Sequence, residues 1–310
     1  MRVIITGVAG FIGSHLAQEL LAEGEVEIIG IDNLSSGLES NLELLRELDT
    51  ENKFIFHNID IRDLDAMKKA VGDLKVDRVF HLAALVSVQE SIDNPLKSGS
   101  INIGGTQNVL ELARYAGAKR IMFSSSAAVY GDEPTLPKNE ESIIRPISPY
   151  GMEKYVGEQY MSMYSQMYGL EAVVFRYFNV YGERQNPTSD YSGVISIFND
   201  RLAKCEGANI YGDGKQYRDF VYVKDVVKAN ILAMKLDSVE YEVFCVGTGK
   251  TTTITQLYEA LQKRYNCDKA PTYLEARKGD ILESVCDNSK IVNKLGLKEF
   301  TPFAEGIYKV

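Results

Sequence analysis

Val3-Ile4-Ile5-Thr6-Gly7-Val8-Ala9-Gly10-Phe11-Ile12-Gly13-Ser14, near the start of this 310-residue chain, decides the fold. Its first four residues are typical of a buried strand, and residues 13–22 predict a helix directly after the turn. Glycine at every third position lets the turn close tightly and lets backbone N–H groups approach a pyrophosphate at the helix start. An ordinary turn would explain a lone match at least as well, and the spacing differs from the common G-x-G-x-x-G. The flanking strand and helix favour a dinucleotide site, whose predicted contacts are Gly7, Gly10, Phe11, Ile12 and Gly13.

The alternation of strand and helix continues along the chain. Short β-branched runs occupy residues 3–6, 26–31, 53–59, 78–82, 120–124, 172–177 and 242–246. Because these runs are apolar at consecutive positions, they indicate parallel strands covered on both faces. We predict an α/β fold, a Rossmann-type doubly wound parallel sheet with a smaller, interleaved C-terminal α/β substrate lobe. The predicted domains are residues 1–178, with a returning strand near 241–247, and residues 179–310.

Composition and charge limit the possible partners. A net charge of −9 without a basic block argues against nucleic acid and anionic membranes as partners. No apolar run approaches the length of a membrane span, and the chain enters a strand pattern at once, so we expect a cytoplasmic protein. The four cysteines lie far apart in the sequence and predict buried thiols without a disulfide framework. No histidine cluster indicates a metal.

Acidic and small residues follow the predicted strands at their carboxyl ends, where open α/β sheets bind ligands. Asp32 ends the second strand, where a carboxylate would hold the adenosine ribose and repel a 2′-phosphate, so NAD is preferred over NADP. Asp60 is explained equally well as a turn cap. His81, like the other histidines, is better explained as a packed or hydrogen-bonded side chain than as a catalytic one. The predicted cofactor contacts here are Asp32, Asn33, Asp60, Ile61, Leu82, Ala83 and Ala84.

The phenol of Tyr150 and the ammonium group of Lys154 lie four residues apart in the sequence. They share one face of a helix that is predicted to begin near Ser148-Pro149. A free phenol titrates at about 10, and the Lys154 cation together with the positive nicotinamide would favour the phenolate of Tyr150. Lys154 therefore makes Tyr150 usable as a base. Ser126 follows the fifth strand and is predicted to hydrogen-bond the reacting oxygen and the phenolate. We interpret Ser124 and Ser125 as caps of the strand end.

Four motifs occur in a fixed order along the chain. They are the glycine turn, Ser124-Ser125-Ser126-Ala127-Ala128-Val129-Tyr130-Gly131, Ser148-Pro149-Tyr150-Gly151-Met152-Glu153-Lys154 and Arg176-Tyr177-Phe178-Asn179-Val180-Tyr181-Gly182. With them the chain resembles the extended short-chain dehydrogenases, and within that family the UDP-hexose and UDP-N-acetylhexosamine 4-epimerases. The match covers nearly the whole chain, including residues 212–221 and 277–280.

The resemblance implies a reaction and a set of site residues. It implies reversible epimerisation at C4 of a UDP-sugar through a 4-keto intermediate, with bound NAD and with Ser126, Tyr150 and Lys154 as the catalytic set. Asn179, Arg218 and Arg277 would hold the UDP diphosphate, which suits guanidinium groups, although surface salt bridges are the ordinary explanation of such arginines. Further implied cofactor contacts are Asn102, Tyr150, Lys154 and Tyr177. A role as a helix N-cap would explain Asn102 equally well. Further implied substrate contacts are Ser126, Val194, Tyr211, Asp280 and Ser284.

Two details separate the chain from relatives that share its scaffold. Ala127 and Ala128 stand where nucleotide-sugar 4,6-dehydratases carry an Asp-Glu pair and UDP-glucuronate decarboxylases a Glu, and alanine cannot exchange protons. By the resemblance, Ser284 stands beside the C2 substituent of the sugar and leaves space for an N-acetyl group, although an ordinary loop serine would explain it too. UDP-GlcNAc and UDP-GalNAc are therefore expected beside UDP-glucose and UDP-galactose.

Other functions stay open at this point. The alternatives are an NAD-dependent nucleotide-sugar dehydrogenase, a UDP-glucuronate 4-epimerase and, least favoured, a non-catalytic NAD-binding regulator. Relatives often pair through helices such as 94–115 and 149–168, so the resemblance also implies a homodimer.

Overall fold

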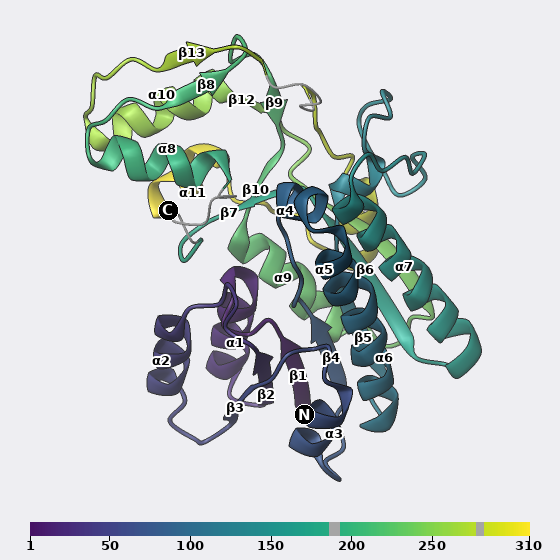
Figure 1. Ribbon diagram of the computed structural model, residues 1–310. Coiled ribbons are helices and arrows are strands. Elements are labelled where there is room, and N and C mark those ends of the chain that lie inside the picture. The colour runs from purple at the N-terminus through teal and green to yellow at the C-terminus, as the bar shows by residue number, and fades with distance from the viewer. Residues whose placement is uncertain (186–192, 277–281) are drawn as a thin grey trace.

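The computed structural model describes residues 1–185, 193–276 and 282–310. Within these ranges, seven parallel strands form one sheet in the order β11-β6-β5-β4-β1-β2-β3 (Figure 1). Their bounds are β1 (Arg2–Thr6), β2 (Glu27–Asp32), β3 (Phe54–Asn58), β4 (Arg78–His81), β5 (Arg120–Ser126), β6 (Glu171–Tyr177) and β11 (Tyr241–Val246). The order reverses between β1 and β4, so this pair is the switch point at which such sheets bind ligands. The predicted fold class is confirmed.

Helices cover both faces of the sheet, as continuous apolar strands require. One face carries α1 (Phe11–Glu23), α2 (Glu39–Leu48), α9 (Val223–Met234) and a π-helical turn (Ile291–Leu295); the other carries α3 (Leu64–Val71), α6 (Thr106–Tyr115) and α7 (Pro149–Tyr168). Neighbouring side chains of β1 enter opposite cores: Ile5 packs with Leu16 of α1, and Ile4 packs with Val109 of α6. The loop after β4 leads through α4 (Val88–Asp93), α5 (Pro95–Gly99) and a π-helical segment (Ser100–Gly105) into α6.

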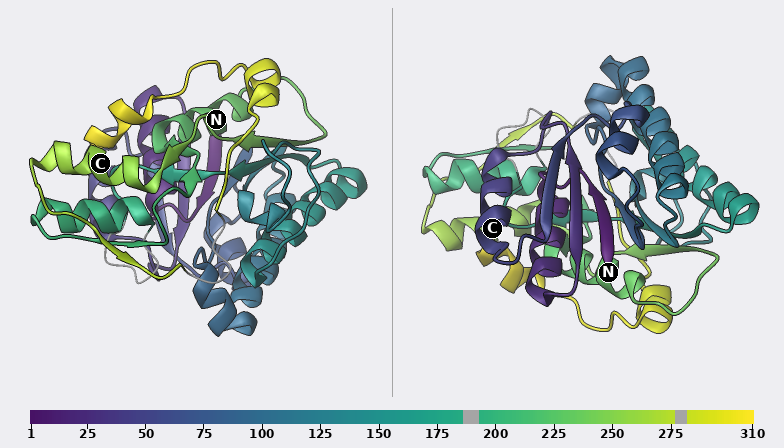
Figure 2. Two further views of the ribbon diagram at one scale, coloured as in Figure 1. Left: turned by 90° about the horizontal axis from the view of Figure 1, so that it is seen from above. Right: turned by 90° about the horizontal axis from the view of Figure 1, so that it is seen from below.

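A smaller lobe lies above the carboxyl ends of the strands in Figure 1. It pairs β7 (Asn179–Tyr181) with β10 (Phe220–Tyr222), β8 (Asn209–Tyr211) with β13 (Thr272–Leu274) and β9 (Tyr217–Arg218) with β12 (Thr252–Thr253). Its helices are α8 (Val194–Ala203), α10 (Ile254–Tyr265) and α11 (Phe303–Gly306), followed by a short 3-10 turn (Ile307–Lys309). Both views in Figure 2 place this green and yellow lobe opposite the blue to teal helices α6 and α7. Since β11 returns to the sheet between β10 and β12, the lobe is interleaved with it; the division at residue 178 stays a prediction.

Local signals fix the ends of α7. The side chain of Ser148 accepts a hydrogen bond from the Gly151 N–H (3.1 Å), Pro149 occupies the first turn, and Gly169 closes the helix in the left-handed region (φ 69°). The helix runs over the predicted residues 149–168.

The prediction of buried thiols is wrong for one cysteine. Cys245, Cys267 and Cys286 are buried, whereas Cys205 is exposed. Cys205 lies just beyond the end of α8 with φ 50°, on a surface turn whose position the sequence spacing did not reveal. Among the described residues, no helix is both long and apolar enough to cross a membrane.

Candidate active site

In the glycine turn between β1 and α1, Gly7 and Gly13 have no room for a side chain. Gly7 adopts φ +76°, and its N–H donates to the Ile31 carbonyl (2.8 Å), which places the turn over β2. A Cβ on Gly13 would come within 2.1 Å of the Gly7 carbonyl oxygen, and one on Gly7 within 2.7 Å of the Ala83 nitrogen. These two glycines therefore let the turn pack tightly against its own backbone and against the loop after β4, with α1 beginning at Phe11. This cradle suits the pyrophosphate of a dinucleotide.

Asp32 lies at the end of β2, beside the glycine turn. Its carboxylate accepts hydrogen bonds from the N–H groups of Ala9 (3.0 Å) and Leu34 (2.8 Å). Burial raises the pKa of Asp32, and these backbone N–H groups oppose the rise. The contacts orient the carboxylate at the edge where the sequence predicts the adenosine ribose.

Asn33 and Asp60 meet at the same edge, from β2 and β3. The Asn33 side-chain amide donates to Asp60 (2.9 Å), and the Arg62 guanidinium donates to both oxygens of that carboxylate (2.9 and 2.7 Å). Hydrogen bonding by Arg62 lowers the pKa of Asp60 to about 2. Asp60 also accepts from the Arg62 backbone N–H (2.9 Å), so the turn-cap interpretation holds beside the cofactor prediction.

Asn102 does not cap a helix. It lies inside the π-helical segment, donates to the Leu85 carbonyl (2.9 Å) and accepts from the Leu85 N–H (2.8 Å). It also donates to the buried Glu153 carboxylate (2.7 Å), so it ties the loop after β4 to α7. The N-cap alternative is wrong because the helix begins several residues earlier. The predicted cofactor contacts Leu82, Ala83 and Ala84 belong to this loop.

His81 is a structural side chain, as predicted. Its ring nitrogens are hydrogen-bonded to the hydroxyls of Thr6 (2.8 Å) and Thr106 (3.0 Å). Burial lowers the pKa of His81 to about 3, so the ring is neutral at physiological pH. No group of metal-ligating side chains occurs in the part of the chain that the structure describes.

The strand-end prediction for Ser124 and Ser125 is wrong, because β5 runs on to Ser126. The Ser125 hydroxyl donates into the protein, to the Glu158 carboxylate (2.5 Å). Ser126 is the capping serine: its side chain accepts from the Ala128 N–H (3.1 Å) and starts a 3-10 helix (Ala127–Tyr130). The cap turns the chain sharply at the carboxyl end of the sheet and leaves the Ser126 hydroxyl at the site.

Tyr150 and Lys154 face this strand end from α7. Burial raises the pKa of Tyr150 to about 12, a hydrogen bond with the Ser126 side chain lowers it, and the Glu153 carboxylate raises it. The Lys154 ammonium donates to the Ser124 carbonyl (2.8 Å) and lies 5.8 Å from the centre of the Tyr150 ring. Burial lowers the pKa of Lys154 to about 8, against the Glu153 charge. The three predicted catalytic side chains are therefore brought together, with a phenol that burial keeps protonated.

A cavity of about 520 Å³ opens beside Ser126. The carboxyl ends of β5 and β6 meet the smaller lobe at this cavity. Five of its lining residues were predicted from the sequence as site residues: Ser126, Tyr177, Asn179, Arg218 and Ser284. The Arg218 guanidinium donates to the carbonyls of Tyr217 (3.0 Å) and Leu282 (3.2 Å), which holds it on β9.

The other residues predicted to contact the substrate are not among the described residues that line this cavity. Val194 begins α8 and Tyr211 ends β8, and their contacts stay predictions. Arg277 and Asp280 lie outside the described residues.

Sequence reasoning missed an apolar wall of the cavity. Val88 and Ile92 of α4, with Ile147 before α7, line it and are 43, 51 and 52% exposed. These residues belong to no motif, so only their shared position could reveal them.

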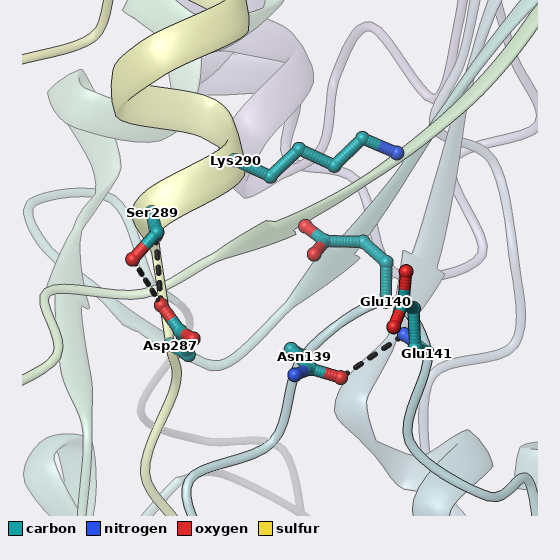
Figure 3. Close-up of a pocket in the computed structure, with 6 residues that line it drawn as sticks. All are labelled: Asn139, Glu140, Glu141, Asp287, Ser289 and Lys290. Carbon is teal, nitrogen blue, oxygen red and sulfur yellow. Dashed lines mark hydrogen bonds between the residues drawn. The ribbon is translucent and has the colours of Figure 1, made fainter.

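Sequence reasoning also missed a buried ion pair between Glu158 and Arg176. Glu158 lies eight residues after Tyr150, a helical spacing that could have placed it on the same face of α7. A second pocket, of about 360 Å³, adjoins this part of the protein; Figure 3 shows the facing segments 139–141 and 287–290 that form it.

Comparison with known proteins defines the class. The chain belongs to the NAD dependent epimerase/dehydratase family, whose family model matches residues 3–247. NAD, predicted from the glycine turn and Asp32, is thus the cofactor of its family.

Relatives within the family place the chain among UDP-sugar epimerases. It is 40% identical over 309 residues to a putative UDP-glucose 4-epimerase of Methanocaldococcus jannaschii, covering 99% of this chain and 96% of that protein. A UDP-glucuronate 4-epimerase of Thermodesulfobacterium geofontis is 32% identical, with 98 and 93% covered.

Two solved structures are similar over almost the whole chain. A UDP-glucose 4-epimerase of Thermotoga maritima with UDP-glucose has a TM-score of 0.92 at 39% identity, covering 99% of this chain and 96% of that chain. A UDP-N-acetylglucosamine 4-epimerase of Methanobrevibacter ruminantium in complex with UDP-N-acetylmuramic acid has a TM-score of 0.90 at 38% identity, with the same shares covered.

Proposed function

We propose that this protein interconverts the C4 epimers of a UDP-hexose or UDP-N-acetylhexosamine, namely UDP-glucose with UDP-galactose or UDP-GlcNAc with UDP-GalNAc. The observation that carries the proposal is the position of Tyr150 and Lys154 on α7 at the end of β5, where Lys154 donates to the Ser124 carbonyl (2.8 Å). Ser126, at the end of the same strand, lines the cavity together with Arg218 and Ser284. The family relationship supports it.

Tyr150 acts as the base in this proposal. Its phenolate removes the proton of the C4 hydroxyl, Ser126 hydrogen-bonds the reacting oxygen, and the Lys154 cation favours the phenolate. The glycine turn and Asp32 would hold NAD, which would supply a reversible acceptor for the C4 hydride, so that no net oxidation results. The product of the first half-reaction is a 4-keto sugar, and Tyr150 gives its proton back when the C4 hydroxyl re-forms.

The sugar has to turn over between the two half-reactions. Asn179 and Arg218 on the lobe side of the cavity hold the UDP moiety, together with Arg277 from the resemblance. Binding concentrated on the distant nucleotide leaves the keto sugar free to rotate without escaping.

The cavity wall favours neutral sugars over a uronic acid. Val88, Ile92 and Ile147 offer apolar surface, and a carboxylate placed against it would lose water without a compensating partner. Among the described lining residues, Arg218 is the only lysine or arginine. The small side chain of Ser284 leaves space for an N-acetyl group.

The proposal is tested by NMR of single substrates. Purified protein with NAD is incubated in turn with UDP-glucose, UDP-GlcNAc and UDP-glucuronate, while NADH absorbance is followed. We expect C4 epimers from the first two and no accumulation of NADH. Stoichiometric NADH would instead identify a nucleotide-sugar dehydrogenase, and turnover of UDP-glucuronate alone a uronate epimerase. The Tyr150→Phe variant should bind the UDP-sugar but not convert it. If the wild type converts no alcohol substrate at all, a non-catalytic NAD-binding regulator would be favoured instead.

We also propose that the protein is a homodimer that pairs through α5, α6 and α7. Large apolar side chains are exposed along this side, among them Leu96 (90%), Met167 (64%), Tyr115 (46%) and Tyr168 (46%). Exposed apolar surface of this kind is typical of an interface between proteins. The cytoplasmic location stays a prediction.

A further inference from the structure

Three side chains of α7 reach β5 at intervals of four residues. Tyr150, Lys154 and Glu158 lie on one face of the helix because four residues are close to one turn. They meet three successive serines: Tyr150 the side chain of Ser126, Lys154 the carbonyl of Ser124 (2.8 Å) and Glu158 the hydroxyl of Ser125 (2.5 Å). The reacting pair is thus one of three contacts between the same helix and the same strand end.

Glu158 connects the helix to a second strand. It is fully buried, and its two oxygens accept from Arg176 Nε (2.9 Å) and a terminal nitrogen (2.7 Å). Arg176 lies on β6 directly opposite Ser125, in the register that next pairs Tyr177 with Ser126. One carboxylate therefore holds both strands that end at the cavity.

The far side of Arg176 is also anchored. Its other terminal nitrogen donates to the Tyr130 hydroxyl (3.1 Å) and to the Glu140 carbonyl (3.2 Å), and Tyr130 donates to the Asn139 carbonyl (2.7 Å). These carbonyls belong to the segment that forms one side of the pocket in Figure 3. A buried network with its members paired is rigid, since any shift would leave a polar group without a partner.

Helix and strand are also in close contact between the polar residues. A Cβ on Gly157 would come within 2.5 Å of the Phe123 ring, so α7 lies directly against β5 at this point. The packing fixes the distance between the two elements.

We propose that Glu158 is a positioning residue, which through Ser125 and Arg176 fixes α7 along its axis and holds Tyr150 opposite Ser126. Glu158 is not among the residues lining the cavity and acts through the backbone it holds. The proposal rests on the proposed function only in taking Tyr150 and Ser126 as the reacting pair. A misplacement of about 1 Å at such a pair can cost on the order of a hundredfold in rate.

Two substitutions test this role. Glu158→Gln keeps the side-chain shape but removes the charge, and Ser125→Ala removes one hydrogen bond while the ion pair stays. We expect kcat to fall about a hundredfold in Glu158→Gln and about tenfold in Ser125→Ala, with KM for the UDP-sugar changed less than about twofold. Ser165→Ala is the matched control, because its hydroxyl donates to the Glu240 carbonyl (2.8 Å) at the far end of α7. Its kcat should equal that of the wild type.

A second measurement does not depend on turnover. The Tyr150 phenol is titrated by ultraviolet difference spectroscopy, with Tyr150→Phe as the blank. The Ser126 hydrogen bond lowers the pKa of Tyr150, so loss of alignment should raise this pKa in both variants. NAD binding and the melting temperature report whether each variant is folded.

The outcomes separate the two proposals. Wild-type kcat and an unchanged Tyr150 titration in folded Ser125→Ala and Glu158→Gln would overturn the positioning role. So would a loss of kcat matched by an equal loss in Ser165→Ala. If Glu158→Gln does not fold, Ser125→Ala decides. If the wild type turns over no UDP-sugar, the proposed function fails, and the Tyr150 titration still decides the positioning role.

Discussion

At the scale of single residues, the chemistry depends on the Tyr150 phenol, whose pKa is changed in opposite directions by its surroundings. Burial raises the pKa of Tyr150 to about 12, and the Ser126 hydrogen bond acts in the other direction. Burial also lowers the pKa of Lys154 to about 8, although the adjacent Glu153 carboxylate opposes this change. A buried phenol beside a buried lysine is the arrangement expected where proton transfer is tuned by the protein.

Removal of the Ser126 hydroxyl should disfavour the phenolate. In Ser126→Ala, the pKa of Tyr150 rises because burial acts without the opposing hydrogen bond. We expect kcat to fall by about ten- to a hundredfold, and the acidic limb of the kcat–pH profile to move to higher pH. Steady-state rates across the pH range measure both. An unchanged acidic limb would show that Ser126 does not tune Tyr150.

Lys154 should determine the alkaline limb of the kcat–pH profile. Since burial lowers its pKa to about 8, it carries its charge below that pH and loses the charge as the pH rises further. Activity of the wild type should therefore decline above about pH 8. Lys154→Arg stays charged throughout, so its activity, although lower at neutral pH, should not decline there. The same alkaline decline in both proteins would argue against this assignment.

At the scale of elements, the glycine turn should tolerate no side chain at Gly13. A Cβ there would lie 2.1 Å from the Gly7 carbonyl, so Gly13→Ala must displace the start of α1. We expect the variant to lose NAD at concentrations that saturate the wild type, and to melt at a lower temperature. Calorimetric titration with NAD measures the first effect. Gly104→Ala is the control, because no atom beyond its own neighbouring backbone lies within 4 Å of the added Cβ, and it should bind NAD normally.

Elements with local signals could be predicted from the sequence, and contacts between distant segments could not. The bounds of α7 follow from Ser148, Pro149 and Gly169, which act on their own backbone. Ser126, Tyr150 and Lys154 could be found because each belongs to a motif. Ser125 was misinterpreted because its partner is 33 residues away on α7.

Asn102 shows the same limit at the scale of an element. Its partner Glu153 is 51 residues away, and no local pattern reports the π-helical segment in which Asn102 lies. The substrate contacts predicted at Arg277 and Asp280 fall outside the described residues, so they stay predictions.

At the scale of the whole molecule, the exposed apolar side of α5, α6 and α7 should bind a second copy of the chain. We expect light scattering of the wild type to give twice the mass of 34.6 kDa. The double variant Leu96→Lys/Met167→Lys should shift the protein toward the monomer, because two charges would be buried in the interface. Tyr308→Lys, at an exposed position of the smaller lobe, should stay dimeric. A monomeric wild type, or an unaffected double variant, would contradict this interface.

The proposed reaction requires that hydride leaves C4 of a UDP-sugar and returns to the same carbon within one active site. The most direct test uses UDP-glucose and UDP-GlcNAc that carry deuterium at C4, with the products analysed by NMR and mass spectrometry. We expect epimerised sugar that keeps the deuterium at C4, with no labelled NADH released. Loss of the deuterium to water, or its appearance in free NADH, would contradict it.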